Sequence, residues 1–298
     1  MNRCQKDTYM VDDKPRSGKS NSPFRYPGGK FYARKLIMEL LPSDIDYYCE
    51  PFVGGGSIYF GQKNKPKALL NDLDTDLMNT YTVIRDHVGE LITALDGILA
   101  TKKNHSYYKN EYKPSNDIEK ALRWFYLNRT SYSGIMKHDN CYWGYGEKYS
   151  MVPKNWPPHL RQVSDSLQGV KLTSIDFEEL IDNLPDGTFC FIDPPYFNAD
   201  QDKFYTCSFT TEDHIRLRDV LERNSNRIQF MLTYDNTDEV IQLYVDWVDA
   251  ILDKEWNYTI ARTDNQKEGL KLKDGHKGNR DKGKEIFILN YCPQPNQS

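Results

Sequence analysis

Short apolar runs bounded by turn-forming residues recur in the first quarter and the last half of the chain, alternating with segments of helical periodicity. This alternation predicts βαβ units around a mostly parallel sheet, whose strands are buried on both faces. The predicted strands are 46–49, 67–71, 170–174, 188–192, 228–233, 251–256 and 285–290. The predicted helices around them are 33–41, 57–62, 76–87, 212–224 and 237–244.

The middle of the chain has a different pattern. Helical periodicity at 88–101 and 118–128 is followed by a stretch rich in glycine and aromatic residues, which includes Tyr132, Trp143 and Tyr145. This change predicts a smaller, mainly helical domain at 88–165, inserted into an α/β domain formed by 23–87 and 166–298. Residues 1–22 are polar and charged without an apolar run, and they are predicted to form a flexible N-terminal tail.

Composition places the chain among water-soluble globular proteins, with 38% hydrophobic and 28% charged residues. No apolar run approaches the roughly 18 residues that span a membrane, so no membrane partner is expected. The six cysteines show no zinc-ligand spacing, which predicts reduced thiols and no metal. A net charge of −4 disfavours binding of nucleic acid by the whole surface, but segment 262–284 holds eight Lys or Arg residues against four acidic ones. Its role is left open.

Asp193-Pro194-Pro195-Tyr196 follows a predicted strand directly, at the sheet edge where open α/β folds bind ligands. An amine on an aromatic ring is a poor nucleophile because its lone pair is delocalised. The Asp193 carboxylate and the Pro194 carbonyl can accept hydrogen bonds from such an amine, which localises that lone pair. Tyr196 offers a face on which a base can stack. The motif predicts a pocket for a planar amine, with an ordinary turn after a strand as the alternative.

A second motif, Glu50-Pro51-Phe52-Val53-Gly54-Gly55-Gly56-Ser57, follows the first predicted strand. Consecutive glycines at such a turn let the backbone approach a ligand closely. The run matches neither the dinucleotide-binding pattern nor the phosphate-binding loop, so a ligand without phosphates fits better. Asp72 closes the next strand, where its carboxylate can accept hydrogen bonds from both hydroxyls of an adenosine ribose. A purely structural turn is the alternative.

A third segment, Phe24-Arg25-Tyr26-Pro27-Gly28-Gly29-Lys30, combines aromatic residues, a tight turn and a cation ahead of predicted helix 33–41. Such a segment can fold over a bound cofactor, with Tyr26 against its adenine and Lys30 near its carboxylate. A turn and helix start without a ligand is equally compatible with it.

In this order, segments 24–30, 50–57 and 193–196 resemble motifs X, I and IV of the α-group amino-methyltransferases, in particular the Dam-like DNA adenine methylases. The resemblance spans 23–291. Asp72 falls where the family places its ribose-binding acid, and Asp176-Phe177 resembles the pair that lines its cofactor adenine pocket. Segment 127–134 is similar to its Asn-Arg-x-x-Tyr-x-Gly recognition segment. Tyr26-Pro27 departs from the Trp-Ala that is frequent there, and Arg25 from a frequent Lys.

The resemblance implies an α/β Rossmann-like methyltransferase fold: a doubly wound sheet of seven mostly parallel strands with an inserted, mainly helical target-recognition domain. It implies S-adenosylmethionine as methyl donor, no metal, and double-stranded DNA as partner, with methyl transfer to N6 of a flipped-out adenine. The predicted catalytic residues are Asp193, Pro194 and Tyr196. The predicted cofactor-binding residues are Tyr26, Lys30, Glu50, Phe52, Gly54, Gly56, Asp72, Asp176, Phe177 and Asp193. The predicted DNA-binding residues are Arg25, Asn128, Arg129, Tyr132 and Ser133.

Several alternatives stay open at this level. Arg25 and Arg129 suit contact with guanine but equally with a phosphate, so GATC is one option for the recognised sequence. The pocket also fits N4-cytosine, RNA or protein-glutamine methyltransferases, and the fold alone fits a non-catalytic DNA-binding subunit. The motif order and segment 128–134 favour adenine in DNA. A cognate restriction endonuclease and the oligomeric state are left open, and the expected location is the cytoplasm of a bacterial or phage-infected cell.

Overall fold

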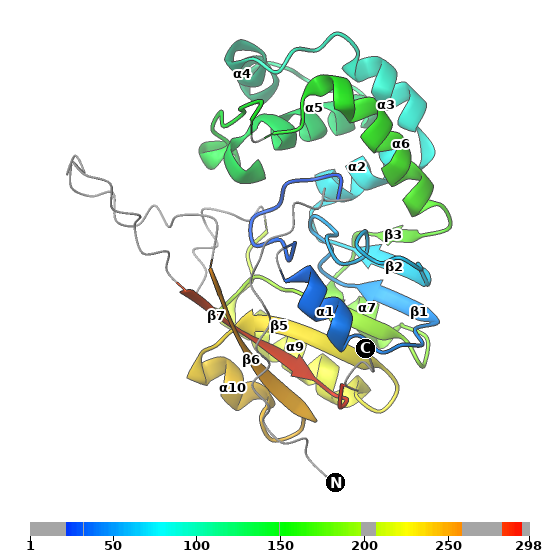
Figure 1. The fold of residues 1–298 in the computed structure, drawn as a ribbon, viewed down its shortest axis with the longest axis vertical. Helices are drawn as coiled ribbons and strands as arrows, with labels where there is room; N and C mark the ends of the chain where they lie inside the picture. The colour runs from blue at the N-terminus through cyan, green and yellow to red at the C-terminus, as the bar shows by residue number, and fades with distance from the viewer. Residues whose placement is uncertain (1–21, 32, 149, 198–206, 258–281, 294–298) are drawn as a thin grey trace, which may run out of the picture.

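A seven-stranded sheet with its helices forms one part of the structure, a computed structural model that describes residues 22–31, 33–148, 150–197, 207–257 and 282–293 (Figure 1). The strand order is β3-β2-β1-β4-β5-β7-β6, and β7 is antiparallel to both of its neighbours while the other pairs are parallel. The strands are β1 Tyr47–Glu50, β2 Lys67–Asn71, β3 Lys171–Thr173, β4 Phe189–Ile192, β5 Gln229–Asp235, β6 Ala250–Asn257 and β7 Lys282–Leu289. The predicted doubly wound, mostly parallel sheet is confirmed. The predicted tail up to residue 21, and the basic segment up to residue 281, lie outside the described residues.

The order in which strands are added to the sheet changes direction between β1 and β4. These two strands are parallel neighbours, and Cys49 is paired with Cys190. From β1 the order runs outward to β2 and β3, and from β4 it runs the other way to β5. Parallel strands end at the same sheet edge, and a crevice forms where the strand order reverses. Glu50, which ends β1, and Asp193, which follows β4, are therefore at this crevice.

Helices cover both faces of the sheet, because successive strand residues point to opposite sides. Tyr48 and Phe189 belong to one apolar cluster, which also includes α1 residues, whereas Cys49 and Cys190 belong to the other. Helix α1 Arg34–Leu40 packs on the first face; α7 Phe177–Asp182, α9 Thr211–Asn224 and α10 Asp238–Tyr244 pack on the second.

The remaining helices gather at one end of the molecule, next to β2 and β3 (Figure 1). They are α2 Thr75–Asp86, α3 Val88–Leu95, α4 Lys102–Asn110, α5 Asp117–Thr130 and α6 Trp156–Leu167. Helix α2 packs on α5 and α6, and one apolar cluster runs from the sheet into these helices. The division at residue 88 therefore stays a prediction, since α2 lies among helices that the sequence assigned to the inserted domain.

All seven predicted strands are present, with ends shifted by no more than three residues. The predicted helix 57–62 is wrong: it forms turns with only one α-helical hydrogen bond, because the Tyr59 N–H donates to the Glu50 carboxylate and Gly61 bonds three residues back. The predicted helix 88–101 is too long. It ends at Leu95, before Gly97 at φ +69°, and α4 then begins after the Thr101 cap. Helices α4, α6 and α7 were not predicted.

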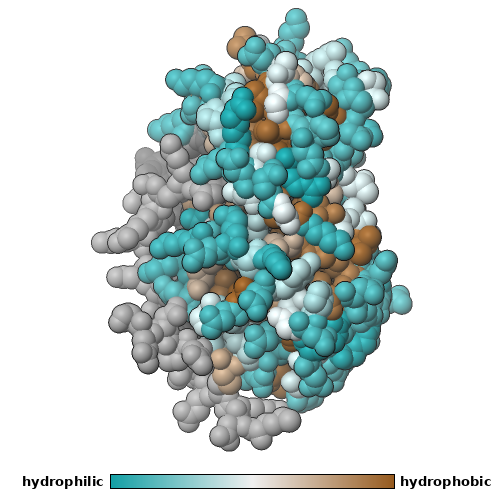
Figure 2. Space-filling view, turned by 90° about the vertical axis from the view of Figure 1, so that its right-hand side faces the viewer, coloured by the Kyte–Doolittle hydropathy of each residue, from teal (hydrophilic) through white to brown (hydrophobic). Residues whose placement is uncertain are grey.

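Among the described residues, the free thiols are Cys49, Cys141, Cys190 and Cys207. Cys292 is disulfide-bonded, so the expectation of reduced thiols is wrong at that position; spacing in a sequence does not reveal pairing. Within the described residues, no helix has the length and apolar character needed to cross a membrane. The face in Figure 2 is mostly hydrophilic, with small hydrophobic groups between larger polar areas.

Candidate active site

Asp193 lies one residue beyond β4 and is contacted by two polar side chains. The Lys30 Nζ atom is 2.6 Å from Oδ1 and 2.8 Å from Oδ2, and Thr233 Oγ1 donates a hydrogen bond to Oδ1 at 2.6 Å. Thr233 belongs to β5, the strand next to β4, so the sheet itself brings this hydroxyl to the carboxylate. The Asp193 side chain is 20% exposed, which leaves the carboxylate within reach of a ligand.

Lys30 is a buried cation, with 4% of its surface exposed. Its ammonium also donates to the carbonyl of Gly28 at 3.0 Å and lies 4.9 Å from the centroid of the Tyr196 ring. Burial on its own lowers the pKa of Lys30, but attraction to Asp193 and Glu285 outweighs it and the pKa is raised. The ammonium is therefore charged at neutral pH.

Tyr196 is oriented by a buried acid. Its hydroxyl donates to Glu285 Oε1 at 2.7 Å, and Glu285 sits on β7 with 2% of its surface exposed. The Tyr234 ring lies beside the Tyr196 ring, at a centroid distance of 6.1 Å. Pro194 is buried and Pro195 half-buried. The ring is thus fixed at its hydroxyl end, while one face meets the Lys30 ammonium.

The glycine turn after β1 is tied to the end of β2. The Gly54 N–H donates to Asp72 Oδ2 at 2.9 Å, and burial raises the pKa of Asp72 to about 6. Gly54 has φ +45°, and a Cβ placed on it would lie 2.8 Å from the Tyr26 ring. Gly56 also has positive φ, +64°. Only glycine fits at Gly54, because the backbone is left-handed and an aromatic ring occupies the side-chain position.

Glu50 stabilises this turn through hydrogen bonds to its carboxylate. Its Oε1 accepts hydrogen bonds from the Tyr48 hydroxyl at 2.6 Å and from the Tyr59 N–H at 2.8 Å. The carboxyl group is 2% exposed, and burial raises its pKa to about 8. The cofactor contact of Glu50 stays a prediction, and these bonds give the residue a structural role in the turn.

An aromatic cluster flanks the turn on the other side. Phe52 lies 5.5 Å from Phe177 and 5.6 Å from Phe209, measured between ring centroids. Asp176 caps α7 by accepting a hydrogen bond from the Glu178 N–H, and its carboxylate is also bonded to Arg216 at 2.8 Å. The predicted pair Asp176-Phe177 therefore lies near Phe52, and its contact with an adenine ring stays a prediction.

Two of the predicted DNA-binding residues are linked by their backbone and amide groups. Asn128 accepts a hydrogen bond from the Arg25 N–H at 3.0 Å and donates to the Arg25 carbonyl at 2.7 Å. Asn128 has no exposed surface. Its amide thus holds segment 22–30 against α5. A Cβ at Gly134, which has φ +74°, would lie 2.3 Å from the Arg25 carbonyl oxygen, so this contact also requires glycine.

Arg129 is buried as well, with 7% of its surface exposed. Burial and the nearby charge of Arg25 lower its pKa to about 10. Its Nη1 donates to the Pro23 carbonyl at 3.4 Å, and its Nε has no hydrogen-bond partner among the residues that the structure describes. In this conformation Arg129, like Asn128, faces the interior.

Tyr132 and Ser133 lie instead on the surface. Tyr132 is 46% exposed, and Tyr142, whose carbonyl accepts its N–H at 2.8 Å, is 62% exposed. Ser133 has φ 52°, the left-handed region that non-glycine residues rarely adopt. The Lys109 ammonium lies 5.4 Å from the Tyr142 ring centroid. The loop thus presents aromatic groups beside a cation.

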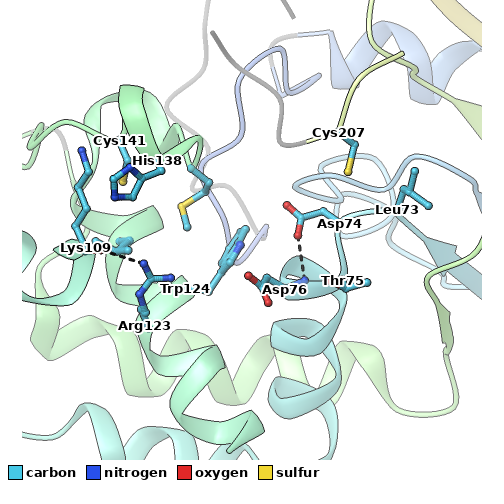
Figure 3. A pocket seen from close by; sticks show the side chains of 12 residues that line it. Leu73, Asp74, Thr75, Asp76, Lys109, Arg123, Trp124, His138, Cys141 and Cys207 are labelled. Carbon is cyan, nitrogen blue, oxygen red and sulfur yellow. Dashed lines mark hydrogen bonds between the residues drawn. The ribbon is translucent and has the colours of Figure 1, made fainter. Parts of the chain in front are cut away.

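A pocket of about 300 Å³ lies between the start of α2 and the helices α4 and α5. Figure 3 shows Asp74 and Asp76 on one side and Lys109 and Arg123 on the other, with Trp124 between them. Arg123 Nη2 donates to the Lys109 carbonyl at 3.1 Å. None of the residues predicted from the sequence to bind or catalyse lines this pocket, and we assign it no step of a reaction.

The structure thus brings together Lys30, Asp193 and Tyr196, and separately Arg25 and Asn128. Two contacts of this cluster were missed from the sequence, Thr233 and Glu285. Each is a polar residue at one end of a predicted apolar strand, Thr233 at the end of 228–233 and Glu285 at the start of 285–290. Among the described residues, no group of three or more His, Cys, Asp or Glu side chains is placed to hold a metal.

Comparison with known proteins gives a consistent result. The family model described as D12 class N6 adenine-specific DNA methyltransferase matches residues 26–260. A type II methyltransferase of Lactococcus lactis subsp. cremoris, M1.LlaDCHI, is 27% identical over 76% of this chain and 85% of that protein. The type II methyltransferase M.CviBI of Paramecium bursaria Chlorella virus NC1A is 24% identical over 90% and 98%. The DNA adenine methylase of Escherichia coli (strain K12) is 24% identical over 68% and 77%.

Proposed function

The chain belongs to the family of D12 class N6 adenine-specific DNA methyltransferases, and from this premise we propose that it transfers the methyl group of S-adenosylmethionine to N6 of an adenine flipped out of duplex DNA. The observation that carries the proposal is the cluster at the carboxyl end of β4. There a carboxylate, an aromatic face and a buried ammonium lie within contact distance of one another. A cognate restriction endonuclease is a further part of the proposal, because two of the relatives are named type II methyltransferases.

The residues around the glycine turn fit the chemistry of S-adenosylmethionine. Asp72 has a carboxylate for the ribose hydroxyls, and Phe52 and Phe177 form an apolar aromatic site for the adenine ring. Tyr26 and Lys30 come from the segment that covers the turn, and Lys30 supplies a cation for the carboxylate. When bound, this cofactor supplies an electrophilic methyl group on its sulfonium.

Asp193 and Pro194 would act on the target amine. Hydrogen bonds from N6 to the Asp193 carboxylate and the Pro194 carbonyl would draw the nitrogen towards sp³ geometry, which would free its lone pair to act as a nucleophile. Stacking on Tyr196 offsets part of the cost of extruding the base, since each base stacked on an aromatic ring contributes about 1–3 kcal/mol. Positioning matters more here than a strong base, because direct attack needs alignment.

The exposed loop around Tyr132 and Ser133 is the proposed contact with DNA bases. Asn128 and Arg129, which are buried, are proposed to act by holding Arg25 and segment 22–30 in place beneath this loop. Arg25 is partly exposed and its Nη1 donates to the Ser131 carbonyl at 3.0 Å, so it remains the proposed cation for a guanine or phosphate. We place the reaction in the cytoplasm, where the substrate DNA lies.

Single-molecule sequencing of DNA from cells that lack adenine methylation and express the protein tests this function. We expect N6-methyladenine at one short sequence with the wild type and none with Asp193→Ala. The matched control is Asp186→Ala, whose side chain is 85% exposed and which precedes β4, at the opposite end of the strand from Asp193. N4-methylcytosine in place of N6-methyladenine, or methylation by Asp193→Ala near the wild-type level, would refute the proposal.

A further inference from the structure

Lys30 occupies the place that the target amine needs. We call this place the amine site: the Asp193 carboxylate together with the ring face of Tyr196. The Lys30 ammonium lies within 2.8 Å of both Asp193 oxygens and 4.9 Å from the ring centroid. A base that stacks on this face and donates its amine to this carboxylate would overlap the Lys30 side chain.

We propose that Lys30 is a placeholder for the target amine, and that it gives up the amine site when the carboxylate of the cofactor offers it another partner. Capture of the base then requires the cofactor to be bound first. This inference rests on the proposed function, which assigns Lys30 to the cofactor and Asp193 and Tyr196 to the base.

The contacts explain why Lys30 does not leave without a replacement partner. The side chain is 4% exposed, and the nearby carboxylates of Asp193 and Glu285 both attract its charge. Moving a buried cation away from its partners, without new ones, leaves a charge that is neither solvated nor paired. A carboxylate on the cofactor removes that penalty, because the Lys30 ammonium then exchanges the Asp193 carboxylate for the cofactor carboxylate as its partner.

The amine site itself is built to receive a donor rather than a lysine in particular. Glu285 fixes the Tyr196 hydroxyl, and Thr233 fixes Asp193 Oδ1, so both parts of the site keep their orientation when Lys30 moves. The exchange therefore changes the occupant of the site while its walls stay in place. Lys30 follows the Gly28–Gly29 turn, and Gly28 has φ +75°. Such a turn allows a local backbone change.

The test uses the fluorescence of 2-aminopurine, placed in a duplex at the methylated position that sequencing identifies. Wild-type protein is saturated with S-adenosylhomocysteine or with its decarboxylated analogue, which lacks only the carboxylate. We expect a several-fold rise in fluorescence with S-adenosylhomocysteine and a much smaller rise with the analogue or with no cofactor. This arm needs no variant, so it does not depend on how a substitution folds.

Substitutions supply the second arm. Lys30→Ala, and Lys30→Met with a similar volume but no charge, should show the same rise with either compound and with none. Lys35→Ala, at a position that is 78% exposed, is the matched control and should behave as wild type. Three outcomes would overturn the inference. They are a rise in 2-aminopurine fluorescence with wild type that is the same with and without the cofactor carboxylate, no rise under any condition, and a dependence on the cofactor carboxylate that persists in both Lys30 variants. Sequencing of methylated DNA reports on the proposed function separately.

Discussion

Replacing Asp193 by asparagine tests whether the charge of this residue, and not only its shape, promotes methyl transfer. Asparagine keeps the volume and one carbonyl oxygen, so Thr233 can still donate to it at the place where it now donates to Asp193 Oδ1. The negative charge is lost. In the proposed mechanism that charge faces an amine nitrogen which becomes positive as the new bond forms.

The size of the effect follows from the distance. Two unit charges about 3 Å apart interact by about 5 kcal/mol at an effective dielectric constant of about 20. With about half a charge on the nitrogen in the transition state, about 3 kcal/mol is lost, which corresponds to a decrease in kcat of about 10²-fold. The Asp193 side chain is 20% exposed, and solvent screening weakens its interaction with the nitrogen, so the 10²-fold decrease in kcat is an upper bound.

The assay is the transfer of a tritiated methyl group to the recognised duplex, measured as kcat and KM, with cofactor affinity measured by calorimetry. Thermal unfolding followed by circular dichroism shows whether the Asp193→Asn protein is folded, since Lys30 loses one of its anionic partners. Lys30→Met combined with Asp193→Asn removes that unpaired charge and serves as control. A kcat close to wild type, with both proteins folded and saturated, would contradict the argument.

Three further substitutions follow from the same geometry. Tyr196→Ala should weaken capture of 2-aminopurine by about 1–3 kcal/mol, the range for stacking, whereas Tyr196→Phe keeps the ring and should lose less; equal losses would contradict stacking. Gly54→Ala should lower the free energy of unfolding more than Gly169→Ala in chemical denaturation, because both have positive φ but only Gly54 has the Tyr26 ring at its Cβ position. Glu50 has a pKa raised to about 8, so the folded protein holds a proton that the unfolded chain releases above its ordinary pKa near 4.5, and stability falls as pH rises between these values. As pH rises from about 4.5 to about 8, the melting temperature of wild type should therefore fall relative to that of Glu50→Gln. If the two melting temperatures change in parallel with pH, this effect is excluded.

The strands could be predicted because each is a short apolar run between turn-forming residues. Strand β2 at Lys67–Asn71 was predicted to the residue, and β4 within one residue, since burial on both faces leaves a continuous apolar signal. The place of Asp193 and Asp72 followed from the same rule, because parallel strands end at one edge of the sheet. Helix ends were harder: the apolar period continues beyond Leu95, but Gly97 adopts positive φ and the helix stops.

The partners of the site residues could not be predicted, because no local pattern records a contact between distant segments. Lys30 and Asp193 are 163 residues apart, and Tyr196 and Glu285 are 89 apart. The same limit explains Asn128. Its motif indicated a contact with DNA, but the structure buries its amide against the Arg25 backbone, and only the fold reveals that interaction.

Segment 22–30 shows why these long-range contacts matter together. Its Arg25 backbone is bonded to Asn128 in α5, its Tyr26 ring packs on Gly54 in the glycine turn, and its Lys30 ammonium lies in the amine site. The six residues from Arg25 to Lys30 thus contact α5, the glycine turn and the Asp193 carboxylate. The Gly28–Gly29 turn lies between the Arg25 backbone, which is bonded to Asn128, and the Lys30 side chain, which is buried in the amine site. In the proposed function this segment, rather than the pocket between α2 and α5, links the recognition of DNA to the amine site, because none of its residues lines that pocket.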